Sequence, residues 1–166
     1  LRGVAISPDG KNAYVSHILA RYQLPTTQLE RGWVNTNAMT VIDVPGQKLI
    51  NTVLVDDVDL GGANPYGITL TADGRNILIT HAGTHELSVI DRAGLHAKLD
   101  KVASGQKVSD ASSSADDVPN DLAFLVGLRR RIKLTGNGPR GLAVIGTNVY
   151  AAEYFTGTLG VVDINP

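Results

Sequence analysis

Four side chains able to bind a metal or to transfer a proton recur at related places along this chain. His17, His81 and Glu153 each end a short stretch of apolar and small residues, and His85 follows His81 by four positions. Neutral imidazoles and a carboxylate gathered at one rim can bind a divalent metal or form acid–base partners. The alternative is structural: each side chain caps its own strand and bonds to a neighbouring loop. The sequence leaves both interpretations open.

Two arginines form a second candidate set. Arg2 and Arg140 stand directly before aligned glycines, and Tyr66 takes that place in the middle copy of the pattern. If these positions line a channel, two guanidinium groups there can bind a carboxylate or a phosphate. The alternative is that they hydrogen-bond to the last carbonyl groups of neighbouring strands.

The sequence segments that must position these residues occur in three similar copies. The copies span residues 1–17 resumed at 37–44, residues 65–91, and residues 139–164. Three sets of residues align: Gly3, Gly67 and Gly141; Gly10, Gly74 and Gly146; and Asn12, Asn76 and Asn148. Self-similarity of this kind indicates a repeat fold.

Each copy has the chemistry of antiparallel strands. Apolar residues alternate with small or polar ones, and turns such as Ser7–Gly10 and Thr71–Gly74 separate the runs. Residues 48–55 and 130–136 predict a fourth strand for the first two copies. Four short antiparallel strands per copy are typical of a β-propeller blade.

We therefore predict an all-β partial β-propeller, a single domain over residues 1–166. Blade 1 spans residues 1–57, blade 2 spans 65–136 with an insertion at 93–128, and an incomplete blade 3 spans 139–166. Three blades cannot close a ring, so missing chain or self-association through the open blade edges must cover the exposed faces.

Two insertions interrupt the copies. The first lies between His17 and Met39 and contains Arg21, Tyr22 and Trp33. The second predicts a short helix over residues 94–102, a polar linker, and a further helix around 120–128 capped by Asn120 or Asp121. Long loops on a rigid β-scaffold often carry binding function.

Composition excludes several classes of protein. The net charge is −1, from 15 basic and 16 acidic residues, which argues against a nucleic-acid surface. We expect the basic run 129–131 to be a solvated outer strand, and the acidic residues Asp56, Asp57 and Asp59 to lie in a solvated loop. Their spacing does not match a calcium loop. No apolar run reaches the roughly 18 residues that span a bilayer.

The tetrapeptides Tyr14–His17 and Leu78–His81, each followed by Val-Ile-Asp at 41–43 and 89–91, resemble the YVTN-type β-propeller repeat. A degenerate version stands at 150–153, followed by Val161–Asp163. The family pattern has Asn where this chain has His17, His81 and Glu153. The first insertion, including residues 20–39, resembles bacterial exported propeller proteins that carry a c-type cytochrome segment. The resemblance implies a periplasmic or extracellular protein with haem in the remainder of the parent protein.

The chain itself contains no Cys, and so it has no Cys-x-x-Cys-His haem motif. We expect no cofactor in this segment. The leading hypothesis is a non-catalytic scaffold or binding propeller of a larger exported, redox-associated protein, with other proteins or missing domains of the same chain as partners. One alternative is a metal-dependent lactonase or hydrolase working at the rim through His17, His81, His85 and Glu153. Another is a surface-layer or adhesion module.

Overall fold

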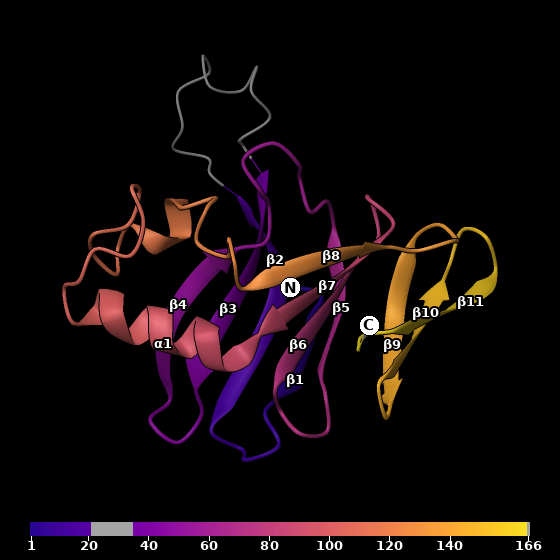
Figure 1. Ribbon diagram of the computed structural model, residues 1–166, viewed down its shortest axis with the longest axis horizontal. Helices are drawn as coiled ribbons and strands as arrows, with labels where there is room; N and C mark the ends of the chain where they lie inside the picture. The colour runs from indigo at the N-terminus through magenta and orange to yellow at the C-terminus, as the bar shows by residue number, and fades with distance from the viewer. Residues whose placement is uncertain (21–34, 166) are drawn as a thin grey trace.

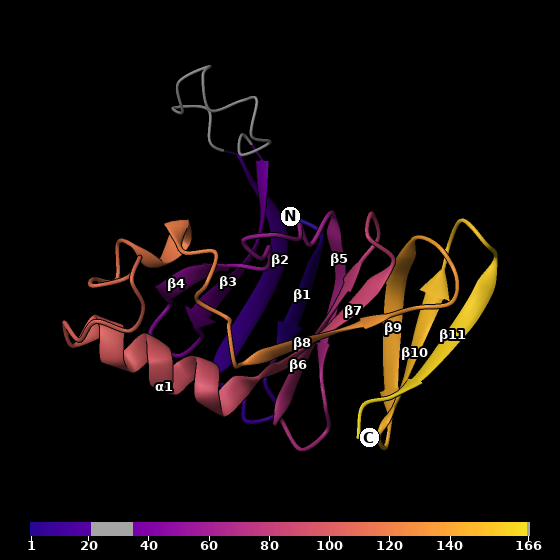
Figure 2. The same ribbon diagram turned by 45° about the horizontal axis from the view of Figure 1, so that its top comes forward.

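The computed structural model describes residues 1–20 and 35–165 and consists of three antiparallel sheets placed side by side (Figures 1 and 2). Blade 1 contains β1 (Gly3–Ile6), β2 (Asn12–Ala20), β3 (Asn35–Asp43) and β4 (Lys48–Leu54). Blade 2 contains β5 (Pro65–Leu70), β6 (Asn76–His81), β7 (Glu86–Asp91) and β8 (Arg129–Lys133). Blade 3 contains β9 (Pro139–Ile145), β10 (Asn148–Glu153) and β11 (Thr158–Asp163).

Each sheet follows the order of the sequence, from an inner to an outer strand. This is a partial β-propeller with an incomplete third blade, and the predicted fold class is confirmed. Arg21, Tyr22 and Trp33 of the first insertion lie outside the described residues.

The first turn of blades 1 and 2 is held by one repeated network. In blade 1 the Ser7 hydroxyl donates to Asp9, and the same carboxylate accepts from the Lys11 amide at 3.1 Å. Gly10 adopts φ +69°, which glycine accepts without strain. Thr71, Asp73 and Gly74 repeat the arrangement in blade 2.

The aligned glycines let the inner strands approach closely. A side chain at Gly3 would lie 2.8 Å from the Tyr66 carbonyl oxygen, and one at Gly67 would collide with the Arg140 carbonyl. A hydroxyl group adds a hydrogen bond at each contact between neighbouring blades. Ser16 donates to the Tyr66 carbonyl at 3.0 Å. The Thr80 hydroxyl donates to the Arg140 carbonyl at 2.8 Å. Gly3 and Gly67 therefore have a packing cause, whereas a side chain at Gly141 would meet no atom within 4 Å.

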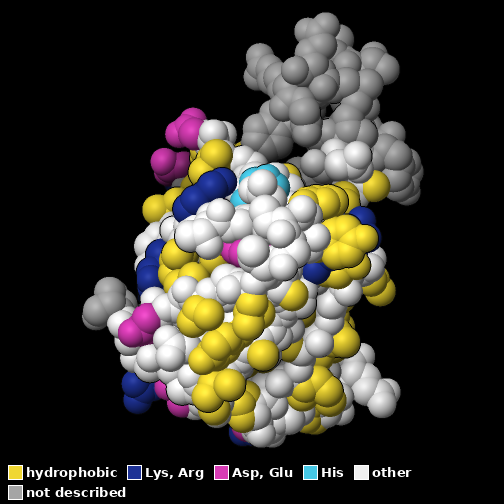
Figure 3. Space-filling model, turned by 90° about the vertical axis from the view of Figure 1, so that its right-hand side faces the viewer, with side chains coloured by type: hydrophobic (Ala, Val, Ile, Leu, Met, Phe, Trp, Pro, Cys, Tyr) yellow, Lys and Arg dark blue, Asp and Glu magenta, His cyan; other side chains and the backbone are white. Residues whose placement is uncertain are grey.

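Two hydrophobic cores fill the spaces between blades. The first joins blades 1 and 2 to the second insertion and includes Tyr14, Met39, Ile79, Leu95 and Phe124. The second joins blades 2 and 3 and includes Leu78, Leu87, Val149 and Ile164. Blade 3 still carries exposed apolar strand residues, and Figure 3 shows hydrophobic side chains gathered on that side of the molecule. They include Ile145, Leu159 and Val161, each more than half exposed.

The second insertion is helical only in its first part. Helix α1 (Arg92–Ala103) contains the predicted 94–102 segment and lies along blades 1 and 2 (Figure 1). The predicted helix at 120–128 is wrong. A 3-10 turn, η2 (Val118–Asn120), is followed by separate turns.

In place of the second helix, separate turns are closed by backbone bonds such as Phe124 to Asp121 and Val126 to Ala123. The Asp121 carboxylate accepts from the hydroxyls of Ser109 and Ser112 and from the Ala123 amide, two residues ahead. The bond from the Ala123 amide is one that a helix N-cap also makes, so the Asp121 side chain does not itself exclude a helix. Gly127 then adopts φ +78° and ends the run of turns.

The basic run 129–131 lies on the outer strand β8 and Arg130 is exposed, as expected, but the side chains of Arg129 and Arg131 are not solvated. The Arg129 side chain is 2% exposed and pairs with Asp57; Arg131 is 10% exposed and pairs with Asp57 and Glu86. Arg130 donates to the carbonyl of Ile164 in blade 3. All three arginines lie on β8 and join blade 2 to its neighbours.

The expectation of a solvated acidic loop is also wrong for Asp56 and Asp57, because both carboxylates bond to other parts of the chain. Asp56 is buried, and its carboxylate accepts from the Asn37 amide at 2.7 Å and from the Gly62 amide at 2.6 Å. Asp57 is paired with two arginines. Asp59 is exposed, as expected. Most of the loop therefore fastens blade 1 to blade 2.

Candidate functional site

The strand registers place both candidate sets at the same end of the blades. Pro65 pairs with His81, and Pro139 pairs with Glu153, so each inner strand begins where the second strand of its blade ends. In blade 1, Gly3 pairs with Ser16, next to His17. The sets differ in what their side chains contact.

His81 is completely buried and uses both ring nitrogens. Its Nδ1 lies 2.6 Å from the Gly62 carbonyl oxygen, and its Nε2 lies 2.7 Å from the Ser88 hydroxyl. A carbonyl oxygen can only accept, so Nδ1 carries the proton, and Nε2 accepts from Ser88. Burial lowers the pKa of His81 to about 4, assisted by the charges of Arg131 and Arg129. This neutral imidazole has no lone pair left for a metal.

Glu153 occupies the equivalent place in blade 3. It is buried, and one carboxylate oxygen accepts from the Gly136 amide at 2.8 Å while the other accepts from the Thr158 hydroxyl at 2.6 Å. Gly62 and Gly136 each stand three residues before the inner strand of their blade. His81 and Glu153 therefore both tie the incoming linker to the third strand of the blade.

The different side chains at this position match different surroundings. His81 donates to a carbonyl oxygen of its linker, whereas Glu153 accepts from an amide of its linker. Gly160 stands where blade 2 has Ser88, and a side chain at Gly160 would collide with the carboxylate of Glu153. We call His17, His81 and Glu153 the clasp residues.

His17 and His85 make simpler contacts. His17 Nε2 lies 2.7 Å from the Thr40 hydroxyl on β3, which is the blade 1 counterpart of the His81–Ser88 contact. His85 Nδ1 accepts from the Gly138 amide at 3.0 Å. Across residues 1–20 and 35–165, no three His, Asp or Glu side chains are grouped closely enough to hold a metal ion.

The second candidate set forms a stack across three blades. The guanidinium carbon of Arg2 lies 5.5 Å from the centre of the Tyr66 ring, and that of Arg140 lies 5.3 Å from the same centre. Arg140 also lies 3.7 Å from the ring centre of Tyr154 and 5.6 Å from that of Phe155. Cation–π contacts within about 6 Å are attractive. We call these five residues the arginine–tyrosine stack.

The two arginines of the stack have no polar partner among the described residues. Neither guanidinium donates a hydrogen bond or forms an ion pair with them, and Arg140 Nε is buried without an acceptor. The expected alternative, hydrogen bonds to strand carbonyls, is therefore not observed for the described part of the chain. Apart from this buried Nε, their guanidinium donors are available to a ligand.

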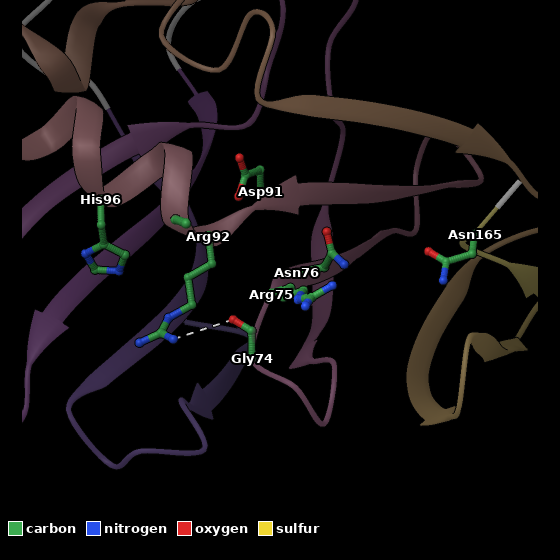
Figure 4. A pocket seen from close by; sticks show the side chains of 8 residues that line it. Gly74, Arg75, Asn76, Asp91, Arg92, His96 and Asn165 are labelled. Carbon is green, nitrogen blue, oxygen red and sulfur yellow. Dashed lines mark hydrogen bonds between the residues drawn. The ribbon is translucent and has the colours of Figure 1, made fainter.

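A third location is an open pocket of about 640 Å³ beside the start of α1 (Figure 4). Arg75 and Arg92 both line it, and Arg92 donates to the Tyr14 hydroxyl at 2.7 Å and pairs with Asp9. His96 bonds to the same hydroxyl at 2.7 Å, and burial lowers the pKa of His96. These groups hold α1 against blade 1, so the pocket is a consequence of packing.

Sequence reasoning missed Tyr154 and Phe155. They occupy the turn between β10 and β11, where blade 2 has Ala82 and Gly83. Both aromatic side chains are more than 60% exposed. The replacement of two small residues by two aromatics within an aligned turn was a detectable signal.

The chain is similar to hydrazine synthase subunit beta of Kuenenia stuttgartiensis, with 29% identity over 164 residues. The match covers 98% of this chain and 40% of that relative, so the chain spans less than half the length of the curated protein it matches. A solved structure of Kuenenia stuttgartiensis hydrazine synthase superposes with a TM-score of 0.84 and 27% identity, covering 99% of this chain and 45% of that one.

More distant structures share the fold alone. A functionally unknown protein from Desulfotomaculum acetoxidans gives a TM-score of 0.57 at 15% identity, covering 99% of this chain and 38% of its own. A chain of a nidogen/laminin complex gives 0.55 at 17% identity, covering 98% and 43%. No family model matches the sequence.

Proposed function

We propose that this chain is a non-catalytic scaffold segment within a larger, multi-subunit, redox-associated protein. The observation that carries the proposal is the similarity along 98% of the chain to a protein named as one subunit of a hydrazine synthase. The superposition with a hydrazine synthase structure at a TM-score of 0.84 supports it. The cytochrome-like resemblance of the first insertion supports the redox association.

The state of the clasp residues supports a scaffold over a hydrolase. A general base or a metal ligand needs an available lone pair near the substrate. Both nitrogens of His81 and both oxygens of Glu153 are engaged in fastening linkers to strands. Their role is then to hold the ends of the blades in place.

Exposed apolar residues at both ends of the blade row support partner binding. Val4 and Ile6 on β1 are 65% and 61% exposed, and blade 3 exposes Ile145, Leu159 and Val161 (Figure 3). A single blade cannot bury both of its faces and must pack on a neighbour. In the proposed assembly, further blades or partner proteins cover these residues.

We propose further that any covalently attached haem of the assembly lies outside this chain, because its attachment needs cysteines that these 166 residues lack. Export to the periplasm or the cell exterior is part of the same proposal. It rests on the resemblance of the first insertion to exported proteins. Within the part of the chain that the structure describes, no helix is both long and apolar enough to cross a bilayer.

The test is to purify the complete gene product from its source under native expression. Native mass spectrometry should find it in a stoichiometric complex that includes a haem-bearing subunit. Metal analysis should find no stoichiometric divalent ion bound through the clasp residues. A product that purifies alone, with one divalent ion that is lost on His81→Ala, would overturn the proposal and favour a metal-dependent hydrolase.

A further inference from the structure

We propose that the arginine–tyrosine stack is a docking site for an acidic polypeptide segment of a partner protein. Arg2, Tyr66 and Arg140 stand at the start of successive inner strands, so three blades contribute to one surface. The inference rests on the proposed function in one respect: the assembly supplies the partner.

The contacts of the guanidinium groups leave their hydrogen-bond donors free. Stacking on an aromatic ring uses the face of a guanidinium, whereas its N–H groups point outward in the plane. Arg140 lies 3.7 Å from the ring centre of Tyr154 and so is held by its face. A carboxylate can then approach the edge and accept two parallel hydrogen bonds.

The stack has no internal counter-ion among the residues that the structure describes. Glu153 lies in the strand pair that carries Arg140, but its two oxygens are taken by Gly136 and Thr158. The buried Nε of Arg140 has no acceptor at all. A carboxylate from outside can therefore reach only the terminal guanidinium nitrogens of Arg140.

The aromatic neighbours favour a polypeptide over a small anion. Tyr154 and Phe155 are 62% and 66% exposed beside Arg140, and their rings pack edge to face 5.4 Å apart. Arginine and tyrosine dominate the binding energy of many protein interfaces. A segment with acidic residues beside an apolar residue would use both parts of the surface, whereas inorganic phosphate would use only the arginines.

Charge argues against a nucleic acid as the occupant. The chain has a net charge of −1, and each arginine of the basic run 129–131 already bonds to another group of the chain. Binding to a nucleic acid backbone needs several basic side chains along one surface. The stack offers two.

The test uses the complete gene product and fluorescence anisotropy. The probe is a fluorescein-labelled hexapeptide of alternating glutamate and leucine, and its glutamine analogue is the matched control. We expect the acidic peptide to bind about tenfold more tightly than the analogue, with an affinity that falls as salt is added.

Variants locate the binding. Arg140→Gln should weaken binding of the acidic peptide about tenfold, and Tyr66→Leu should weaken it several-fold by removing the ring that holds both arginines. Arg75→Gln is the matched control and should change the affinity less than about twofold, because Arg75 is 84% exposed and lies outside the stack. If Arg140→Gln fails to fold, Arg2→Gln, at an exposed position, replaces it.

Several results would overturn the docking site. They are equal affinity for the two peptides, equal effects of Arg140→Gln and Arg75→Gln, or phosphate binding that depends on Arg140 without any peptide binding. A stoichiometric complex whose affinity is unchanged by Arg140→Gln would remove this inference and leave the proposed function standing. If the gene product forms no complex but binds the acidic peptide in a way that depends on Arg140, the docking site stands and the proposed function is overturned.

Discussion

The clasp residues and the arginine–tyrosine stack lie at the same end of the same blades but differ in hydrogen bonding. His81 and Glu153 are buried, and each makes two hydrogen bonds to its linker and its third strand. Arg2 and Arg140 contact aromatic faces and make no side-chain hydrogen bond with the described residues. Polar groups of one kind hold the fold together, and those of the other kind are free to bind.

This difference separates stability from binding. Removing a satisfied buried group leaves its partners unpaired, which destabilises the fold. Removing a stacked cation on the surface costs the fold little but removes the donors that a ligand needs. Substitutions of clasp residues should therefore lower the free energy of unfolding, whereas substitutions in the stack should mainly lower the affinity for a ligand.

The largest effect is expected for His81→Ala. The substitution leaves the Gly62 carbonyl and the Ser88 hydroxyl unpaired and opens a cavity between them. We expect the free energy of unfolding to fall by about 4 kcal/mol. Denaturant titration followed by circular dichroism measures it. His81→Asn, the residue of the repeat pattern, should cost less; an equal loss in both would argue against the hydrogen-bond explanation.

Acid should reduce the contribution of His81 to the stability of the fold. Burial lowers the pKa of His81 from 6.5 to about 4, next to the charges of Arg131, Arg129 and Glu86. The unfolded chain therefore binds a proton more readily than the folded one. This contribution, about 3 kcal/mol, is complete above pH 6.5 and is lost as the pH falls to about 4.

Unfolding titrations between pH 7.5 and 4 measure this dependence. His96, whose pKa is also lowered, remains in both proteins when the wild type is compared with His81→Asn. The difference between the two curves isolates His81. Parallel curves would show that His81 does not titrate in this range on unfolding.

Glu153→Ala should have an intermediate effect. It leaves the amide of Gly136 without its acceptor and frees the Thr158 hydroxyl. We expect a loss of about 2 kcal/mol in the free energy of unfolding, measured by denaturant titration. Glu153→Gln keeps one acceptor oxygen and should lose about half as much. If Glu153→Ala left the free energy of unfolding unchanged, the hydrogen bonds of Glu153 would not stabilise blade 3.

The smallest effect on stability is expected in the stack. Arg140→Gln removes cation–π contacts but no hydrogen bond or ion pair with a described residue, so the free energy of unfolding should change by less than about 1 kcal/mol. Thermal unfolding measures it beside Arg75→Gln. A loss as large as that of His81→Ala would make the stack a structural element and end the contrast between the two regions.

Much of the fold was predictable because its causes are local. The Ser7–Gly10 and Thr71–Gly74 turns satisfy their own polar groups within a few residues. Repetition of these turns and of alternating strands was enough to predict three blades. The helix at 94–102 was predicted from its own residues, and in the structure Leu95 and Leu99 also pack it into the core of blades 1 and 2.

The errors occurred where distant residues intervene. Arg129 and Arg131 looked solvated because their partners Asp57 and Glu86 lie far away in sequence. Where a helix was predicted at 120–128 the structure has turns, and the Asp121 carboxylate accepts from the hydroxyls of Ser109 and Ser112. Local preference does not include such partners.

The sequence by itself indicated repeated blades and placed His81 and Glu153 at the ends of their strands; for His17 that prediction is wrong, because β2 continues to Ala20. Only the tertiary structure decided which of those residues are occupied. The linker partners of His81 and Glu153 lie 19 and 17 residues away, and Arg140 meets a ring from another blade. Whether a polar side chain is fully hydrogen-bonded depends on groups that folding brings together. The candidate residues His81 and Glu153 are therefore fully bonded inside the fold, whereas the two candidate arginines form a free cationic surface.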